Sequence, residues 1–198
     1  MPLNWYARPF VKGSGSAVVD AGEKVGAKTS TPKIYCDLDG CLVDFEKGCQ
    51  TVMGETPDKL KAKVMWGLAR AKDFYETLDW MPDGRELWEG VADLQPTILT
   101  GLPMGKWAEP QKRNWCKREL GEHVPVITCM SRDKHTYCRH GDILIDDRAS
   151  LEPAWQRAGG VFIHHTCANS SLEKLKALLP AVDETKPDDQ GSAKRQKN

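Results

Sequence analysis

The sequence predicts an α/β fold in which five parallel strands form a sheet that helices cover on both faces. Short apolar runs alternate with helical patterns, and each run ends in a polar turn. Such alternation is typical of βαβ units, whose crossover connections join parallel strands. With 198 residues, the chain is long enough for one such domain with an insertion. The predicted strands are 34–36, 96–100, 124–128, 142–146 and 160–164.

The first strand and the segment after it organise the rest of the chain. Residues 34–36 are β-branched, aromatic and small apolar, a composition that suits a buried strand. A short helix is expected next, and then a second helix with Thr56 as its N-cap and Pro57 as its first residue. An aromatic cluster at 74–81 closes this region. We therefore predict a small helical insertion at 45–82.

The later helices are placed by their apolar periodicity and by their flanking residues. Ser150 and Ser170 are the expected N-caps of the last two helices, and Gly121 and Gly159 are expected helix stops. The helices are predicted at 82–94, 109–120, 150–158 and 171–179.

The two ends of the chain differ in composition from the region between them. Residues 1–31 mix Gly, Ser, Ala, Lys and Thr without a sustained apolar period, and 181–198 are polar. We expect a disordered N-terminal arm at 1–31, a core domain at 32–180 and a disordered tail at 181–198.

The composition excludes several classes of protein. Basic and acidic residues both number 28, so no overall positive charge favours nucleic acid or a membrane, and any phosphate binding must be local. Seven cysteines without CxxC pairs favour reduced thiols. The sequence shows no secretory signal and no apolar run that could span a bilayer. We expect a cytoplasmic protein, with organelle targeting as an open alternative.

Polar residues at the strand ends are expected to meet at one edge of the sheet, because ligands bind at the carboxyl ends of parallel strands. Carboxylates, a hydroxyl and lysines in one place suit a phosphate together with a divalent cation, and carboxylate oxygens favour Mg²⁺. The residues that converge are Asp37, Asp39, Thr100, Gly101, Lys112, Arg132, Lys134, Asp146 and Asp147.

Other residues have a less specific interpretation. An acidic pair followed by Gly also occurs in turns and in Ca²⁺ loops. His164 and His165 end a strand without a further ligand at useful spacing, which favours a structural role over a metal site. Trp66, Phe74, Tyr75 and Trp80 favour the core over stacking on a base. Trp107, in an exposed loop near Thr100, is the better candidate for a substrate contact.

The strand-end motifs resemble those of the haloacid dehalogenase superfamily of phosphohydrolases over about residues 33–179. The motifs are DLDG at 37–40, ILTG at 98–101, Lys112, and ILIDD at 143–147. The segments QKRNWCKRELG, SRDK and DILIDDR are similar to the 5′(3′)-deoxyribonucleotidase group. The insertion at 45–82 is shorter than the helical cap of that group, and the cap selects the substrate.

The resemblance implies a three-layer Rossmann-like fold with a small cap, and it assigns roles to the predicted residues. Asp37 would be the nucleophile, and Asp39 would be the general acid and base. Mg²⁺ would be held by Asp37, the Asp39 carbonyl and a carboxylate of Asp147 or Asp146. Thr100, Gly101 and Lys112 would hold the phosphoryl group; Arg132 and Lys134 would add an anionic contact, and Trp107 a substrate contact.

The expected function is that of a Mg²⁺-dependent phosphomonoesterase that acts on a nucleotide or another small phosphomonoester through an aspartyl-phosphate. Two alternatives remain open at this point. One is a phosphatase of phosphorylated DNA or RNA ends, and the other is a phosphate-binding module without catalysis. The oligomeric state is open as well.

Overall fold

The computed structural model describes residues 31–71 and 73–179. The expected N-terminal arm, apart from Thr31, and the expected tail lie outside these residues. Within the described ranges, no helix combines the length and the apolar character needed to cross a membrane.

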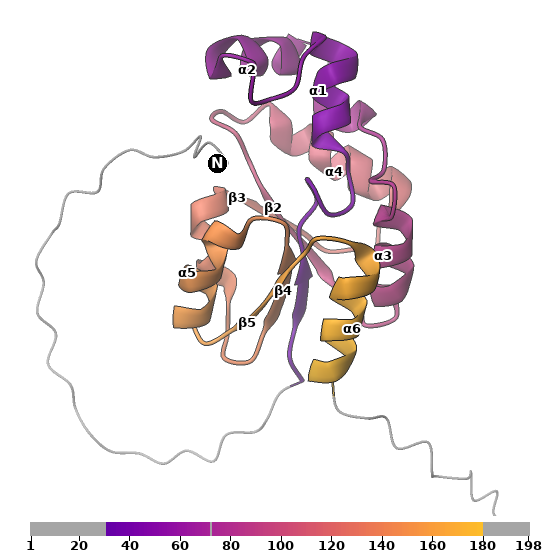
Figure 1. Cartoon of the computed structure of the whole chain (residues 1–198), viewed down its shortest axis with the longest axis vertical. Helices are drawn as coiled ribbons and strands as arrows, with labels where there is room; N and C mark the ends of the chain where they lie inside the picture. The colour runs from indigo at the N-terminus through magenta and orange to yellow at the C-terminus, as the bar shows by residue number, and fades with distance from the viewer. Residues whose placement is uncertain (1–30, 72, 180–198) are drawn as a thin grey trace, which may run out of the picture.

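The predicted five-stranded parallel sheet is confirmed, with the strand order β3-β2-β1-β4-β5. The order places β1 at the centre, paired with β2 on one side and with β4 on the other. The first strand therefore delivers its end residues to the middle of the sheet edge (Figure 1). The strands are β1 Ile34–Cys36, β2 Thr97–Gly101, β3 Val126–Cys129, β4 Ile143–Asp146 and β5 Val161–His164.

Alternate residues of the strands feed two hydrophobic cores, as expected for a sheet covered on both faces. On one face Cys36 and its neighbours pack in the same cluster as Leu87 and Leu175. On the other face Tyr35 packs in a smaller cluster around Trp155. Figure 1 shows α5 (Glu152–Arg157) on one side of the sheet, and α3 (Gly84–Ala92) and α6 (Ala168–Leu178) on the other.

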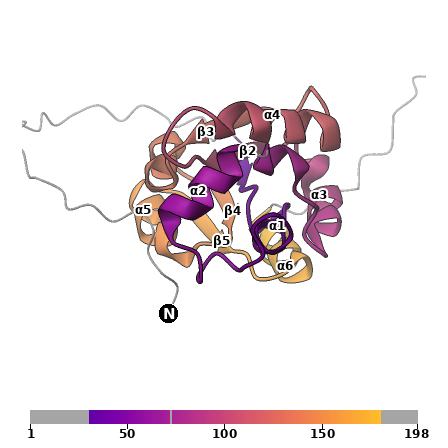
Figure 2. The ribbon, with the colours of Figure 1, turned by 90° about the horizontal axis from the view of Figure 1, so that it is seen from above.

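The insertion after β1 contains α1 (Phe45–Met53), α2 (Ala62–Ala71) and the 3₁₀ helix η1 (Phe74–Thr77). The chain that leaves the core and the chain that returns to it form an antiparallel bridge at Val43 and Trp80, where the Asp44 amide donates to the Asp79 carbonyl at 2.9 Å. The Met81 amide donates to the Leu42 carbonyl at 2.8 Å. Seen from above, α2 lies across the strands of the sheet, and α1 is seen end-on in front of α6 (Figure 2).

The second helix of the insertion begins later than predicted. It starts at Ala62, and Thr56 and Pro57 instead belong to a turn in which the Lys59 amide donates to the Thr56 carbonyl at 3.1 Å. The prediction failed because Thr-Pro-Asp suits a β-turn with Pro at its second position as well as it suits a helix start.

The predicted helix stops are confirmed, but the two predicted serine caps are wrong. Gly121 and Gly159 have φ of +105° and +92°, the left-handed conformation that ends a helix. Ser150 lies within the 3₁₀ helix η3 (Ala149–Leu151), and Ser170 lies inside α6. The first amide of α6, that of Ala168, donates instead to Oδ2 of Asp83 at 2.6 Å. Asp83 is distant in sequence, so local patterns could not identify it.

Candidate active site

A tight loop holds the two predicted aspartates at the end of β1. The Asp37 amide still pairs with the sheet, donating to the Ile145 carbonyl at 2.9 Å. The loop then turns so that the Val43 amide donates to the Leu38 carbonyl at 2.9 Å. Gly40, with φ of +76°, closes the turn, and a Cβ there would lie 2.4 Å from Oδ2 of Asp147. This position therefore needs glycine both for its conformation and for the space it leaves.

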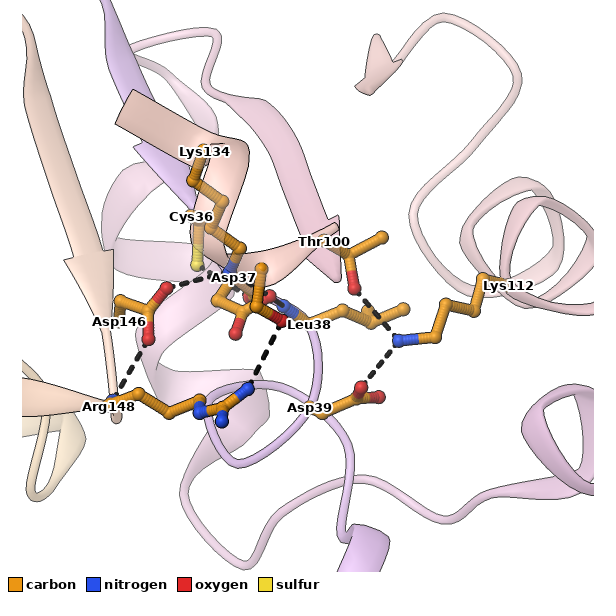
Figure 3. Close-up of polar contacts among 10 residues, drawn as sticks. Cys36, Asp37, Leu38, Asp39, Thr100, Lys112, Lys134, Asp146 and Arg148 are labelled. Atoms are coloured by element: carbon orange, nitrogen blue, oxygen red, sulfur yellow. Dashed lines mark hydrogen bonds and ion pairs between the residues drawn. The ribbon is translucent and has the colours of Figure 1, made fainter. Parts of the chain in front are cut away.

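The end of β4 brings two more carboxylates to Asp37. One carboxylate oxygen from each of Asp37, Asp146 and Asp147 lies within 4.8 Å of the others. The Lys134 ammonium lies between two of them, 2.8 Å from Oδ1 of Asp37 and 2.7 Å from Oδ2 of Asp146 (Figure 3). Lys134 is buried, and it comes from the 3₁₀ helix η2 (Ser131–Tyr137) after β3. This acidic cluster thus contains one lysine and three aspartates.

Burial shifts the protonation of this cluster. Burial raises the pKa of Asp147 to about 8, and the negative charges of Asp37 and Asp146 add to the effect. Burial also raises the pKa of Asp146 to about 6, against the opposing charge of Lys134. For Lys134, burial would lower the pKa, but Asp146 and Asp37 outweigh it, so the net direction is upward. The cluster stabilises a lysine cation and has more carboxylates than one lysine can neutralise.

The residues of the acidic cluster fit a divalent cation. Three ionised carboxylates would leave two negative charges uncompensated by Lys134, which a divalent cation would balance. Both oxygens of Asp146 have protein partners, since Oδ1 accepts from the Arg148 amide at 2.9 Å. By contrast, Oδ1 of Asp147 is buried and has no hydrogen-bond partner among the described residues. Buried polar atoms are normally paired, so this oxygen is available to a cation. Among the described residues, Oδ1 of Asp39 is also buried without a hydrogen-bond partner.

A second buried lysine forms a separate group with Asp39. Lys112, from α4 (Ala108–Glu119), forms an ion pair with Oδ2 of Asp39 and donates to Oγ1 of Thr100 at 2.9 Å (Figure 3). Its ammonium also lies over the Tyr75 ring, 4.4 Å from the ring centroid. Burial raises the pKa of Asp39, although the charge of Lys112 opposes this shift. Of the two predicted lysines, then, Lys134 contacts the expected nucleophile and Lys112 contacts the expected acid.

Three other predicted residues occupy different environments. Gly101 ends β2 where a Cβ would lie 2.0 Å from Oγ of Ser131, so the strand end approaches η2 closely. Arg132 is exposed, and its charged group lies 3.8 Å from Oδ1 of Asp133. Trp107 is only half-buried, with its ring 5.7 Å from that of Tyr75. The sequence predicted Trp107 to be exposed, and it is partly covered because the insertion folds against its loop.

Sequence reasoning did not single out Ser131 and Arg148. The Arg148 guanidinium donates to Oγ of Ser131 at 3.1 Å, and its amide holds Asp146. Each lies next to a strand-end motif, in SRDK and in IDDR. This position next to the predicted site residues was the one feature of the sequence that could have identified them.

The two histidines have structural partners. Nε2 of His164 lies 3.1 Å from the Asp147 carbonyl oxygen, and Nδ1 of the buried His165 lies 2.9 Å from Oγ of Ser171. Neither residue belongs to the group of aspartates that could hold a metal.

Comparisons with known proteins find distant similarities. No family model matches the chain. The chain is 25% identical to the mitochondrial 5′(3′)-deoxyribonucleotidase of Mus musculus, over 76% of this chain and 80% of the mouse protein. A solved HAD-superfamily hydrolase from Ehrlichia chaffeensis aligns with a TM-score of 0.45 and 12% identity, over 75% of this chain and 99% of the other. The chain is thus distantly similar, over about three quarters of its length, to a 5′(3′)-deoxyribonucleotidase, and its strand-end motifs resemble those of the haloacid dehalogenase superfamily.

Proposed function

We propose that the chain is a Mg²⁺-dependent phosphomonoesterase that hydrolyses a nucleotide through an aspartyl-phosphate on Asp37. The observation that carries this proposal is the setting of the Asp37 carboxylate at the centre of the sheet edge. Its Oδ1 accepts from the Leu38 amide at 2.8 Å and pairs with Lys134. These contacts fix the carboxylate through one oxygen, so that the other can attack phosphorus.

The reaction needs two steps that this chain's side chains can perform. In the first, an oxygen of Asp37 bonds to phosphorus while the bond to the leaving oxygen breaks, and Asp39 gives that oxygen a proton. In the second, Asp39 takes a proton from water as the water oxygen attacks the aspartyl-phosphate, which releases phosphate and restores Asp37. Thr100 and Lys112, which contact each other at 2.9 Å, can hold the phosphoryl oxygens while their charge spreads.

The acidic cluster is the proposed Mg²⁺ site. Asp37 and Asp147 would hold the ion together with the Asp39 carbonyl, while Asp146 would orient Lys134. The ion would supply positive charge that offsets the repulsion between the phosphoryl group and the aspartates.

The distant relationship to a deoxyribonucleotidase supports a nucleotide as the substrate. The insertion also places the half-buried ring of Trp66 near that of Trp107, with the ring centroids 6.4 Å apart. Arg132 and Trp107 stay predicted substrate contacts.

A phosphate-release assay on a panel of substrates tests the proposal. The panel contains nucleoside monophosphates, sugar phosphates and a phosphorylated oligonucleotide, each with and without Mg²⁺. We expect Mg²⁺-dependent release from nucleotides and its loss in Asp37→Asn. Retained activity in a clean Asp37→Asn preparation would refute the nucleophile. A preference for the oligonucleotide would favour a phosphatase of nucleic-acid ends, and no release from any compound would favour a binding module.

A further inference from the structure

Lys112 is held on three sides, and one of these sides belongs to the insertion. An ammonium has three N–H donors, and Lys112 faces the Asp39 carboxylate, the Thr100 hydroxyl and the face of the Tyr75 ring. Its side chain is fully buried. A cation over an aromatic face is attracted by the ring, and the attraction grows when water is excluded. The Tyr75 ring thus completes the shell that fixes the direction of the lysine.

The backbone of Tyr75 is held in turn by the residue next to Lys112 on the same helix. Oε1 of the buried Gln111 accepts from the Tyr75 amide at 3.0 Å, and its Nε2 donates to Oδ1 of Asp73 at 3.3 Å. The Tyr75 ring also packs against Phe45, with the ring centroids 6.1 Å apart. Helix α4 therefore carries Lys112 and also fixes the ring that covers it.

We propose that Gln111 and Tyr75 are positioning residues that hold the Lys112 ammonium on Asp39, and so direct Asp39 toward the leaving oxygen. The inference rests on the proposed function for its catalytic consequence. Neither side chain needs to touch the substrate. Gln111 fixes the backbone of Tyr75, the ring of Tyr75 confines Lys112, and Lys112 fixes the Asp39 carboxylate.

The dependence on the leaving group distinguishes this role from a merely structural one. A nucleoside monophosphate loses a basic alkoxide that needs a proton, whereas p-nitrophenyl phosphate loses a weakly basic phenolate that can depart without one. A variant that misdirects the acid should therefore lower kcat/KM for the nucleotide more than for the phenyl ester. A variant that only loosens the fold should lower both equally.

The test compares Gln111→Met and Tyr75→Leu with two controls. We expect each to lower kcat/KM for a nucleoside monophosphate about tenfold more than for p-nitrophenyl phosphate. A displaced Lys112 holds the phosphoryl oxygens less well in both substrates, whereas the loss of general acid catalysis, worth about 10²–10⁴-fold in full, affects only the nucleotide. Tyr75→Phe keeps the ring and should stay near the parent protein on both substrates. Asn114→Ala should also change neither; it removes a hydrogen bond of 3.0 Å between α4 and Glu76, outside the Lys112 shell.

Two outcomes would overturn the inference while leaving the proposed function intact. One is a fold-change in kcat/KM that is the same for both substrates in Gln111→Met and in Tyr75→Leu, and the other is a selective loss in Tyr75→Phe as large as in Tyr75→Leu. Failure of the proposed function would be seen differently, as no Mg²⁺-dependent release by the parent protein or full release by Asp37→Asn.

A stability measurement tests the Tyr75–Lys112 contact without any activity. Urea unfolding of Tyr75→Leu, Lys112→Met and the double variant forms a double-mutant cycle. We expect the double variant to be less destabilised than the sum of the single variants, because the two side chains lose one shared contact. Additive effects would overturn the contact on which the inference depends. If Tyr75→Leu does not fold, the same cycle with Tyr75→Met replaces it.

Discussion

The two buried lysines of the site are alike in burial and differ in their partners. Lys134 lies between two carboxylates that are themselves buried, those of Asp37 and Asp146. Lys112 has one carboxylate partner, Asp39, whose side chain is 27% exposed, and it completes its shell with a hydroxyl and an aromatic ring. Lys134 is thus surrounded by charge from the core, and Lys112 by mixed groups from the core and the insertion.

This difference divides the site into two halves with different roles. The Lys134 half consists of Lys134 with its aspartates, and the Lys112 half of Lys112 with Asp39, Thr100 and Tyr75. The Lys134 half contains the expected nucleophile and the aspartates that could hold a cation, so its geometry depends on charge balance. The Lys112 half contains the expected acid, and its geometry depends on how the insertion packs on α4. A change in one half should therefore be distinguishable from a change in the other.

The largest expected effect is that of removing Lys134. In Mg²⁺-free solution, Lys134→Met should lower the free energy of unfolding by about 3–5 kcal/mol, because it leaves two buried carboxylates without their cation. Lys112→Met should cost less, about 1–3 kcal/mol, because Asp39 can reach water. Urea unfolding measures both, and the exposed Arg132→Met on the same segment as Lys134 should stay within about 0.5 kcal/mol of the parent. A greater cost for Lys112→Met would break the comparison.

A smaller effect is expected from Mg²⁺ binding, which should stabilise the protein through the Lys134 half and not through the Lys112 half. At a Mg²⁺ concentration about 100 times Kd, the parent protein should gain about 2.7 kcal/mol in stability. Asp147→Asn should lose this gain, since it removes the negative charge of a carboxylate whose buried Oδ1 has no hydrogen-bond partner among the described residues. Asp39→Asn should keep it, because that side chain belongs to the Lys112 half. Thermal unfolding with Mg²⁺ and with a chelator measures both variants, and an undiminished gain in Asp147→Asn would place the cation elsewhere.

The smallest expected effect concerns His165, a buried titratable group outside both halves. Burial lowers its pKa below 6.5, and His164 and Lys174 add to the effect while Asp83 opposes it. The unfolded chain then binds a proton that the folded protein does not, so this contribution to stability is complete above pH 6.5 and is lost as the pH falls. The free energy of unfolding changes with pH by at most about 1.4 kcal/mol per pH unit through this one group. Urea unfolding near pH 7.5 and near pH 5.5 measures how much the free energy of unfolding falls between the two. This fall should be smaller in His165→Asn than in the parent protein; an equal fall in both would assign the acid sensitivity to other groups.

Much of the fold could be predicted because its signals are local. The residues of β1, β2 and β4 are short apolar runs, and Gly121 and Gly159 end helices through their own backbone conformation. The prediction failed where a local signal had two solutions or a distant partner. Thr56-Pro57 formed a turn in place of a helix start, and α6 is capped by Asp83 from another part of the chain.

The sequence by itself determined the order of the strands along the chain and which polar residues lie at their carboxyl ends. It did so because apolar periodicity and chain connectivity set which end of each strand faces the site. Only the tertiary structure decided which lysine meets which aspartate, since the sequence assigned Lys112 to the phosphoryl group and Lys134 to a further anionic contact, and neither to a particular aspartate. The packing of η2 directs Lys134 to Asp37, and the packing of Tyr75 on α4 confines Lys112 to Asp39. Side-chain reach over a few ångströms depends on such packing, and no local pattern encodes it.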